Sequence, residues 1–214
     1  GVKNYFKEKY GRETVFIPNG VSAAEPESAD LIKQKFNLDK DGYILYLGRL
    51  VPEKGIQYLI DAYNNINTSK KLVIAGGSSD TAQFEYELKT SAQDNESITF
   101  TGFVQGKLLR ELYSNAYLYV LPSDLEGMPL SLLEAMSYSN CCLTSDITEC
   151  ADVMGDAGIV FRKSDADDLR KKLQFLCDNP IVVNSYKEKS ADYICKKYKW
   201  DDIVQKTLQV YKAK

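Results

Sequence analysis

The chain of 214 residues carries 27 Lys and Arg against 30 Asp and Glu, a formal net charge of −3, and 44% of its residues are hydrophobic. This balance excludes the general positive field that binding to nucleic acid or an anionic bilayer uses, so any bound anion must be held by a local cluster of cations. No apolar run approaches the roughly 20 residues of a membrane-spanning helix, and the charged N-terminus does not resemble a signal peptide, so we expect a soluble, cytoplasmic protein.

The predicted elements begin with a helix over about residues 2–10, a short strand and turn in TVFIPNGV, and an amphipathic helix in SADLIKQKF. From Gly42 onward, β-rich runs alternate with helix-like stretches. The strand-like runs are Tyr43–Leu47, Leu72–Ala75, Ile98–Phe100, Tyr117–Leu121, Cys141–Thr144 and Gly158–Phe161. The helix-like stretches lie at about 55–65, 81–94, 106–115, 130–138 and 165–177. Two further helices, IVVNSYKEKSADYICKKY and WDDIVQKTLQVYK, follow with no strand between or after them.

The alternation of strands and helices indicates βαβ units. Their right-handed crossovers give a parallel sheet with helices on both faces. The runs YILYL and YLYVL are apolar without alternation, as expected for strands that are buried on both sides. The sequence therefore predicts a single α/β domain with a helical tail.

Histidine is absent, which excludes Ser-His-Asp and Cys-His nucleophile systems and His-ligated metals from these residues. The cysteines are odd in number and form neither a CxxC pair nor a zinc-ligand spacing. They are Cys141, Cys142, Cys150, Cys177 and Cys195. Because Cys141 and Cys142 begin the apolar run CCLT, we expect them to fill the core as small hydrophobic residues in a reducing compartment.

Five unusual segments follow predicted strands. They are GRLVPEKG (48–55), GGSS (76–79), TGFV (101–104), PSDLEGMP (122–129) and SD (145–146). Because the strands of a parallel sheet all point the same way, these loops open at one edge, where ligands bind in such folds. Their convergence predicts a ligand site at that edge.

The first of these loops, GRLVPEKG, carries two cations, Arg49 and Lys54, directly before a helix. The free N–H groups of a helix N-terminus favour an anion, and together with a guanidinium and an ammonium group they suit a pyrophosphate. The alternative is that both residues are ordinary surface cations and that the glycines only serve the turn.

The segment LEGMPLSLLEAM holds two carboxylates eight positions apart, Glu126 before a helix and Glu134 inside it. Gly127 permits a tight turn and Pro129 suits a first helical position, so the helix N-terminus should offer backbone N–H groups to a phosphate. Carboxylates accept hydrogen bonds from paired sugar hydroxyls, so the two could bind opposite ends of a diphosphate compound. Alternatively, Glu126 stabilises the helix dipole and Glu134 belongs to a solvated stripe.

Two other loops carry weaker signals. GGSS follows a strand but does not match the G-x-G-x-x-G fingerprint, so a close-packed turn is the favoured role of Gly76 and Gly77. In TGFV, Phe103 could lie beside a planar base or belong to the core.

In this order and spacing, GRLVPEKG, TGFV and LEGMPLSLLEAM resemble the C-terminal domain of retaining glycosyltransferases of group 1, or family 4, which have the GT-B architecture. The resemblance covers nearly the whole chain, from FIPNGV to YKWDDIVQKTLQVY. It implies a Rossmann-like three-layer fold that binds the nucleotide-sugar donor. Ser22 departs from a common aspartate and Ser145-Asp146 from a glycine-rich turn, which leaves the donor sugar open.

The resemblance also implies roles for single residues. Arg49 and Lys54 would bind the donor diphosphate and stabilise the departing nucleotide. Glu126 would contact hydroxyls of the donor sugar and Glu134 would contact the ribose. The implied donor-binding residues are Gly48, Phe103, Val104, Gly127, Met128, Pro129, Leu130 and Glu134. Cations and helix termini would neutralise the leaving diphosphate, so no metal and no cofactor is implied.

The implied reaction transfers a hexosyl or N-acetylhexosaminyl group, with retention of configuration, from a nucleoside diphosphate sugar to a saccharide or glycolipid acceptor. The EGMP variant favours UDP. Residues 1–13 would be a linker from an N-terminal domain that holds the acceptor, and the helix in 199–214 would cross back to it. This half alone would bind nucleotide without turnover. Relatives build cell-surface polysaccharide, so a full-length enzyme would work at the inner face of the cell membrane.

Two other functions stay open on the sequence. A non-catalytic nucleotide- or anion-binding module of the same fold would carry the same loops. A nicotinamide-dependent oxidoreductase would need Gly76 and Gly77 to form a degenerate dinucleotide site. Such an enzyme would bind NAD, whereas the transferase domain would bind UDP, GDP or ADP.

Overall fold

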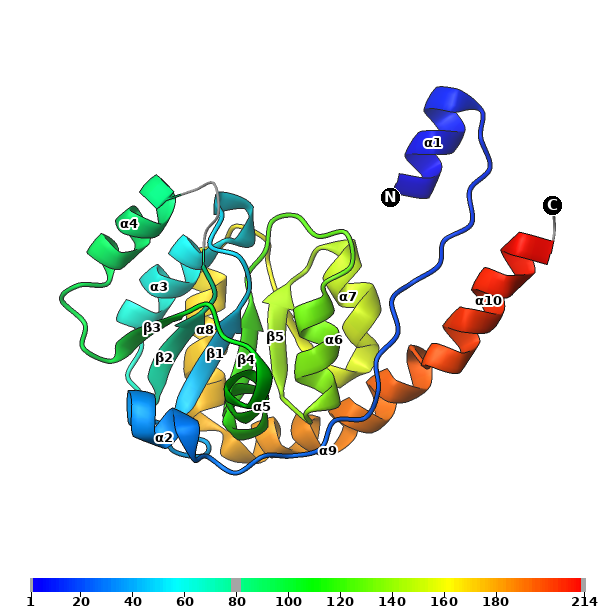
Figure 1. Cartoon of the computed structure of the whole chain (residues 1–214). Coiled ribbons are helices and arrows are strands. Elements are labelled where there is room, and N and C mark those ends of the chain that lie inside the picture. Colours follow the sequence, from blue (N-terminus) through cyan, green and yellow to red (C-terminus); the bar gives the residue numbers. More distant parts are fainter. Residues whose placement is uncertain (1, 78–81, 213–214) are drawn as a thin grey trace.

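The six predicted strands form one parallel sheet in the computed structural model, which describes residues 2–77 and 82–212 (Figure 1). The strands are β1 (Tyr43–Leu47), β2 (Lys71–Ala75), β3 (Ile98–Gly102), β4 (Leu118–Leu121), β5 (Cys142–Ser145) and β6 (Ile159–Phe161). Their spatial order is β3-β2-β1-β4-β5-β6, and all neighbouring pairs are parallel. This confirms the Rossmann-like architecture and makes β1 and β4 neighbours where the strand order reverses.

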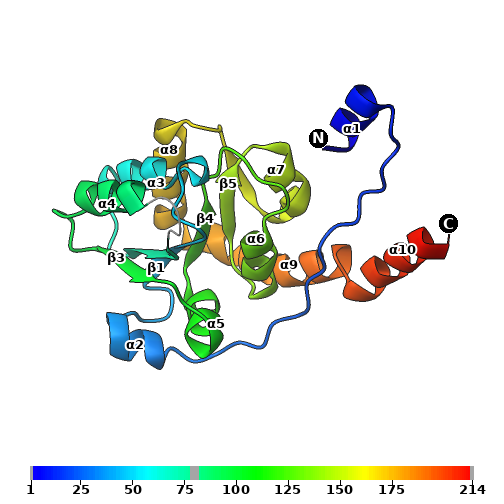
Figure 2. The same ribbon diagram turned by 45° about the horizontal axis from the view of Figure 1, so that its top comes forward.

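The described residues form ten α-helices, most of which cover the two faces of the sheet. They are α1 (Val2–Tyr10), α2 (Leu31–Phe36), α3 (Ile56–Asn64), α4 (Ala82–Ser91), α5 (Gly106–Asn115), α6 (Leu130–Ser137), α7 (Thr148–Met154), α8 (Ala166–Asp178), α9 (Pro180–Lys197) and α10 (Trp200–Lys212). Figure 2 shows α3, α4 and α8 on one side of the strands and α5 and α6 on the other. Within the described residues, none of the helices combines the length and the apolar character needed to cross a membrane.

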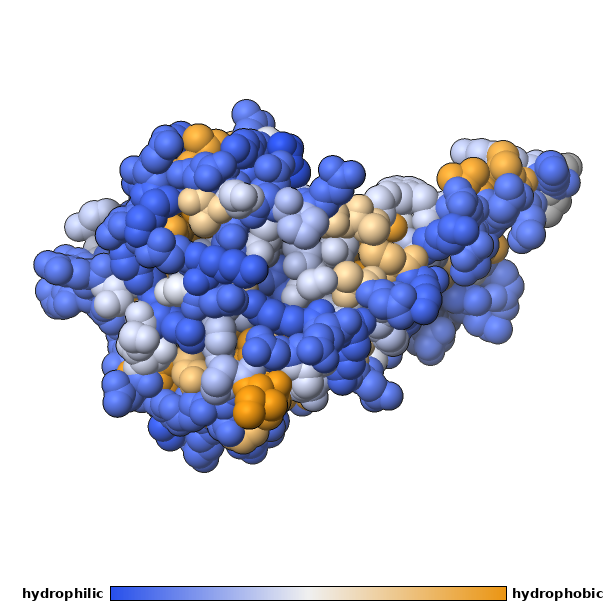
Figure 3. Space-filling view, turned by 90° about the horizontal axis from the view of Figure 1, so that it is seen from below, coloured by the Kyte–Doolittle hydropathy of each residue, from blue (hydrophilic) through white to orange (hydrophobic). Residues whose placement is uncertain are grey.

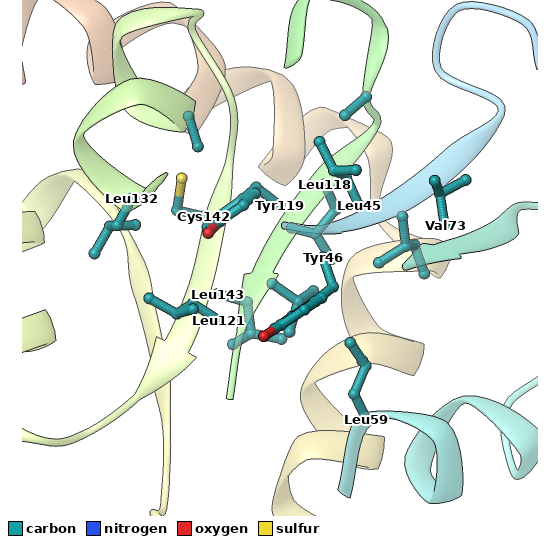
Figure 4. Packing of buried hydrophobic residues seen from close by; sticks show 14 of the residues in the cluster. Leu45, Tyr46, Leu59, Val73, Leu118, Tyr119, Leu121, Leu132, Cys142 and Leu143 are labelled. Atoms are coloured by element: carbon teal, nitrogen blue, oxygen red, sulfur yellow. The ribbon is translucent and has the colours of Figure 1, made fainter. Parts of the chain in front are cut away.

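The central strands are buried on both faces, which explains their unbroken apolar runs. β4 is buried along its whole length and β1 over all but its last residue. Tyr46 and Tyr119 pack among aliphatic side chains of neighbouring strands (Figure 4). Their hydroxyl groups donate to main-chain carbonyls at the carboxyl edge, Tyr46 to Arg49 at 2.9 Å and Tyr119 to Leu47 at 3.3 Å. Buried phenols therefore hold the main chain at the end of β1 and in the loop that follows it.

Two predictions of local structure are wrong. Segment 14–21 forms no strand, and its one β-type contact is an isolated bridge between Val21 and Lys199. Val15 and Phe16 are exposed, so these apolar residues have no sheet neighbour to pack against. In addition, α7 was not expected, because seven residues are too few for helical periodicity to be recognised.

Parts of four predicted segments lie outside the described residues. They are residues 78–79 of the GGSS loop, residue 81 of the helix expected at 81–94, and residues 1 and 213–214 of the two terminal segments.

The helices α1 and α10 extend away from the sheet on the same side of the molecule (Figures 1 and 2). The chain after α1 meets the start of α10 where the Val21 N–H donates to the Tyr198 carbonyl at 2.9 Å and Gly20 packs against the Trp200 ring. Both helices expose large apolar side chains, whereas the face at the amino ends of the strands is mainly hydrophilic (Figure 3). The exposed side chains are Tyr5, Phe6 and Tyr10 on α1 and Trp200, Val204, Leu208 and Tyr211 on α10.

Candidate functional site

The loops after β1, β2 and β4 contact one another at the carboxyl edge of the sheet. Gly76 has a φ of 137°, and a Cβ there would overlap the carbonyl oxygen of the half-buried Gly48, in agreement with the close-packed turn favoured for it. Gly55 has a φ of 66°, and a Cβ there would overlap the carbonyl oxygen of Pro122. Only glycine allows these close backbone approaches. The three loops therefore form one continuous surface.

Lys54 and Glu126 form an ion pair on this surface. Lys54 Nζ lies 2.5 Å from Glu126 Oε1, although the two residues are 72 positions apart. The pair is largely shielded from water, with 15% of the Lys54 side chain and 6% of the Glu126 side chain exposed. The structure therefore joins two predicted ligand residues directly, because the loops after β1 and β4 leave neighbouring strands.

A third side chain holds this pair. The Ser123 hydroxyl, which is fully buried, donates to the same Glu126 Oε1 at 2.7 Å. The Ser123 carbonyl in turn accepts a hydrogen bond from the Ser145 hydroxyl at the end of β5. Ser123 was not predicted as a site residue from the sequence. Its position in the loop PSDLEGMP, three residues before Glu126, is the signal that could have found it.

Asp124 fastens the same loop to its neighbours. Its carboxylate accepts hydrogen bonds from the Tyr58 hydroxyl at 3.1 Å and the Ser164 hydroxyl at 2.7 Å. Its backbone N–H donates to the Glu53 carbonyl at 2.8 Å. The loop after β4 is thus tied both to the β1–α3 connection and to the segment after β6, and these bonds stabilise the geometry of the Lys54–Glu126 pair.

Arg49 lies on the same edge but is not part of the pair. Its side chain is 70% exposed, and its guanidinium is 3.9 Å from the Glu53 carboxylate. Because Tyr46 holds the Arg49 carbonyl, the main chain is fixed while the side chain reaches into solvent. Arg49 is therefore available to an anion without breaking a strong internal contact.

The helix α6 begins at Leu130, four residues after Glu126 in the same loop. No side chain caps the helix there, so its first N–H groups are left for another acceptor. Gly127 and Leu130 are exposed, Pro129 is buried, and the half-buried Met128 accepts a contact from the Asn19 N–H through its sulfur at 3.0 Å. The helix end predicted to bind an anion thus has no side-chain cap of its own, and its binding role stays a prediction.

Glu134 lies in a different place, on a cavity of about 560 Å³ between α5, α6 and the chain after α1. Its Oε2 accepts a hydrogen bond from the Tyr113 hydroxyl at 3.1 Å. Leu130 also lines this cavity, but Arg49, Lys54 and Glu126 do not. The four predicted ligand side chains thus do not share one closed pocket. Lys54 and Glu126 are paired, Glu134 borders the cavity, and Arg49 faces solvent.

The predicted base-binding residues differ from each other in burial. Phe103 is 78% exposed on the loop after β3, so an ordinary core role is excluded for it in the described chain. Val104 is buried and packs in the core. Phe103 is therefore free to contact a ligand, whereas Val104 mainly holds its loop in place.

The cysteines behave as core residues. Cys141, Cys142 and Cys150 are buried, all five are free thiols, and burial raises the pKa of Cys141 and of Cys150 to about 12. Across residues 2–77 and 82–212, no three His, Cys, Asp or Glu side chains gather closely enough to hold a metal ion.

Comparison with known proteins identifies the family of this chain. The family model for glycosyl transferases group 1 matches residues 28–200. O-antigen chain mannosyltransferase B from Escherichia coli is 30% identical over 202 residues, which cover 92% of this chain and 51% of that protein. The N,N'-diacetylbacillosaminyl-diphospho-undecaprenol alpha-1,3-N-acetylgalactosaminyltransferase of Campylobacter jejuni is 25% identical over 193 residues, or 87% of this chain and 49% of that one.

A solved structure shows the same fold. Anabaena Alr3699/HepE in complex with UDP and glucose superposes with a TM-score of 0.89 at 16% identity, over 99% of this chain and 61% of that one. This chain spans about half the length of the curated relatives it matches. The family match and the shared fold agree with the motifs at the sheet edge, and the chain belongs to the group 1 glycosyl transferases.

Proposed function

We propose that this chain binds the donor of a retaining glycosyltransferase, a nucleoside diphosphate sugar with UDP as the nucleotide and a hexose or N-acetylhexosamine as the sugar. The observation that carries the proposal is the meeting of Lys54 and Glu126 beside the uncapped N-terminus of α6. A cation, a carboxylate and free backbone N–H groups at one point suit a ligand that joins a diphosphate to a sugar.

In this proposal the cations neutralise the diphosphate. Lys54 is held in the loop, and the exposed Arg49 can close over the phosphates from the solvent side. Their charges, with the N-terminus of α6, stabilise the negative charge that builds up on the leaving nucleoside diphosphate. The reaction would then need no metal ion, and chelation by EDTA should leave the donor affinity unchanged.

The carboxylates would recognise the two ends of the donor. Glu126 Oε2 makes no hydrogen bond within the described chain, so it can accept from sugar hydroxyls. Glu134 borders the cavity beside α5 and would accept from the ribose hydroxyls. The exposed ring of Phe103 would pack against the base.

The acceptor would be bound by a second half of the enzyme, which we place against the helices α1 and α10. The exposed apolar side chains of both helices give such a half a surface to pack on. The relatives' length supports this, because this chain spans about half of it. The names of those relatives, an O-antigen chain mannosyltransferase and a transferase acting on a diphospho-undecaprenol-linked sugar, support a saccharide or glycolipid acceptor and a role in polysaccharide synthesis. We place this reaction at the cytoplasmic side of the membrane as part of the proposal. This half alone is then expected to bind donor without turnover.

Calorimetric titration of the 214-residue chain tests the proposal. UDP, GDP, ADP, their glucose and N-acetylglucosamine derivatives, and NAD are compared at fixed salt. We expect UDP and a UDP-sugar to bind and NAD not to bind. Binding of NAD in place of every nucleoside diphosphate would overturn the proposal. Retention is tested separately, by NMR of the product anomer formed by a chain that includes both halves.

A further inference from the structure

The two predicted ligand carboxylates are each held through one oxygen only. In Glu126, Oε1 accepts from both Lys54 Nζ at 2.5 Å and the Ser123 hydroxyl at 2.7 Å. In Glu134, Oε2 accepts from the Tyr113 hydroxyl at 3.1 Å. Among residues 2–77 and 82–212, no hydrogen bond uses the other oxygen of either carboxylate.

The hydroxyl donors are rigid. Ser123 is fully buried directly after β4, and its carbonyl accepts from the buried Ser145 hydroxyl at the end of β5. This bond fixes the main chain at Ser123, and full burial restricts the Ser123 side chain, so its hydroxyl fixes the rotamer of Glu126 rather than following it. Without Ser123, Glu126 Oε1 would keep only its contact with Lys54, whose flexible four-carbon side chain can follow several rotamers of Glu126.

Tyr113 is equally constrained. Its ring is buried in α5 and stacks on Tyr138 with 5.4 Å between the ring centroids and an angle of 14° between the planes. Burial raises the pKa of Tyr113, and nearby Tyr119 and Glu134 raise it further, so the phenol stays protonated at physiological pH. Its hydroxyl is 3.1 Å from Glu134 Oε2 and 3.3 Å from the Ser131 carbonyl oxygen, and the charged carboxylate is the stronger of these two acceptors.

We propose that Ser123 and Tyr113 are positioning residues, each of which holds one oxygen of a carboxylate with a buried hydroxyl and so turns the other oxygen toward the donor. Ser123 acts through Glu126 on the sugar, and Tyr113 acts through Glu134 on the ribose. The inference rests on the proposed function, because it assigns support to the two carboxylates of that site.

The test uses two affinity ratios, one sensitive to the role of Ser123 and the other to the role of Tyr113. We define the sugar gain as the affinity for a UDP-sugar divided by that for UDP, using the tighter of UDP-glucose and UDP-N-acetylglucosamine. The nucleoside gain is the affinity for UDP divided by that for inorganic pyrophosphate. Both are measured by calorimetry on the 214-residue chain.

Ser123→Ala is expected to lower the sugar gain by about tenfold and leave the nucleoside gain unchanged, because only the Glu126 rotamer is released. Tyr113→Phe is expected to lower the nucleoside gain by about tenfold and to leave the sugar gain unchanged. In a Glu126→Gln chain, Ser123→Ala should have no further effect on the sugar gain. A merely structural role would lower both gains together and would not depend on Glu126.

Matched controls are Ser190→Ala, a buried serine on α9, and Tyr117→Phe, whose hydroxyl donates to the Leu176 carbonyl at 2.7 Å. Neither should change either gain. If Ser123→Ala does not fold by circular dichroism, Ser123→Cys replaces it. Because a thiol is a weaker donor of similar size, the Ser123→Cys variant should lower the sugar gain by a smaller factor.

The outcomes distinguish the two proposals. A wild-type chain that binds neither UDP nor a UDP-sugar overturns the proposed function. A wild-type chain with clear gains that Ser123→Ala and Tyr113→Phe both leave intact overturns only the positioning role.

Discussion

Lys54 Nζ lies 2.5 Å from Glu126 Oε1, so the cation predicted for the diphosphate and the carboxylate predicted for the sugar are paired with each other. Both side chains are largely buried, and neither could lose its partner without leaving a poorly solvated charge. The pair therefore contributes to stability as well as to the proposed site.

Removing the Lys54 side chain should affect both the stability of the chain and its binding of UDP. We expect Lys54→Ala to lower the free energy of unfolding by about 3 kcal/mol, because Glu126 is left with an uncompensated charge. The same change should weaken UDP binding by about tenfold or more. Urea unfolding and calorimetry measure the two effects.

The double variant Lys54→Ala/Glu126→Gln separates the effect on stability from the effect on UDP affinity. The neutral amide removes the unpaired charge, so part of the lost stability should return while the affinity for UDP stays low. Wild-type affinity in Lys54→Ala would remove this lysine from the proposed site.

Replacing Arg49 should weaken UDP binding with little effect on stability. Its side chain is 70% exposed and its contact with Glu53 is long, so Arg49→Ala should change the unfolding free energy by less than about 0.5 kcal/mol. Its affinity for UDP should nevertheless fall by about tenfold. The control is Arg162→Ala, also 70% exposed but following the edge strand β6, where no loss of UDP affinity is expected.

Two glycines in the proposed site should respond differently to a methyl group. Gly55→Ala places a Cβ against the Pro122 carbonyl at a positive φ, so we expect a loss of at least about 2 kcal/mol and weaker UDP binding. Gly127→Ala meets no atom within 4 Å and should keep wild-type stability. Thermal unfolding of both variants checks this, and equal melting temperatures would contradict the loop geometry described for Gly55.

The sequence predicted the sheet well because buried parallel strands leave an unbroken apolar pattern. The strands β1 and β4 were placed almost to the residue from YILYL and YLYVL. The candidate site followed from topology together with the charged residues of the loops and the family resemblance, since loops after parallel strands must share an edge. In this way Lys54 and Glu126 could be assigned to one region without knowledge of their contact.

The remaining features depend on side-chain packing that no local pattern encodes. The Ser123 hydroxyl reaches Glu126 because the loop after β4 folds back on itself, and Tyr113 reaches Glu134 because α5 lies beside α6. The separation of Glu134 from the Lys54–Glu126 pair likewise depends on the direction in which α6 leaves the loop. Spacing in the sequence could not determine any of these.

A buried carboxylate outside the site should affect the stability of the chain but not its affinity for UDP. Glu111 on α5 is fully buried and accepts the Ile32 N–H at 3.0 Å, so it caps α2, and its other oxygen lies 3.5 Å from Lys107 Nζ. Glu111→Ala should cost about 2 kcal/mol, because a buried N–H loses its acceptor. Glu111→Gln keeps an acceptor and should cost less. Neither should change UDP affinity, and a loss of affinity in both would show that α2 supports the site.

The cysteines should differ in reactivity with their burial. Because burial raises the pKa of Cys141 and of Cys150 to about 12, only about one of these thiols in ten thousand is ionised at pH 8. Cys177 and Cys195 are only half-buried, so iodoacetamide can reach them more easily. Timed alkylation of the native chain, followed by peptide mass spectrometry, should therefore modify Cys195 and Cys177 well before the buried thiols. In urea all the cysteines should react at similar rates. Early modification of Cys141 in the native chain would mean that the start of β5 is less protected than its place between β4 and β6 requires.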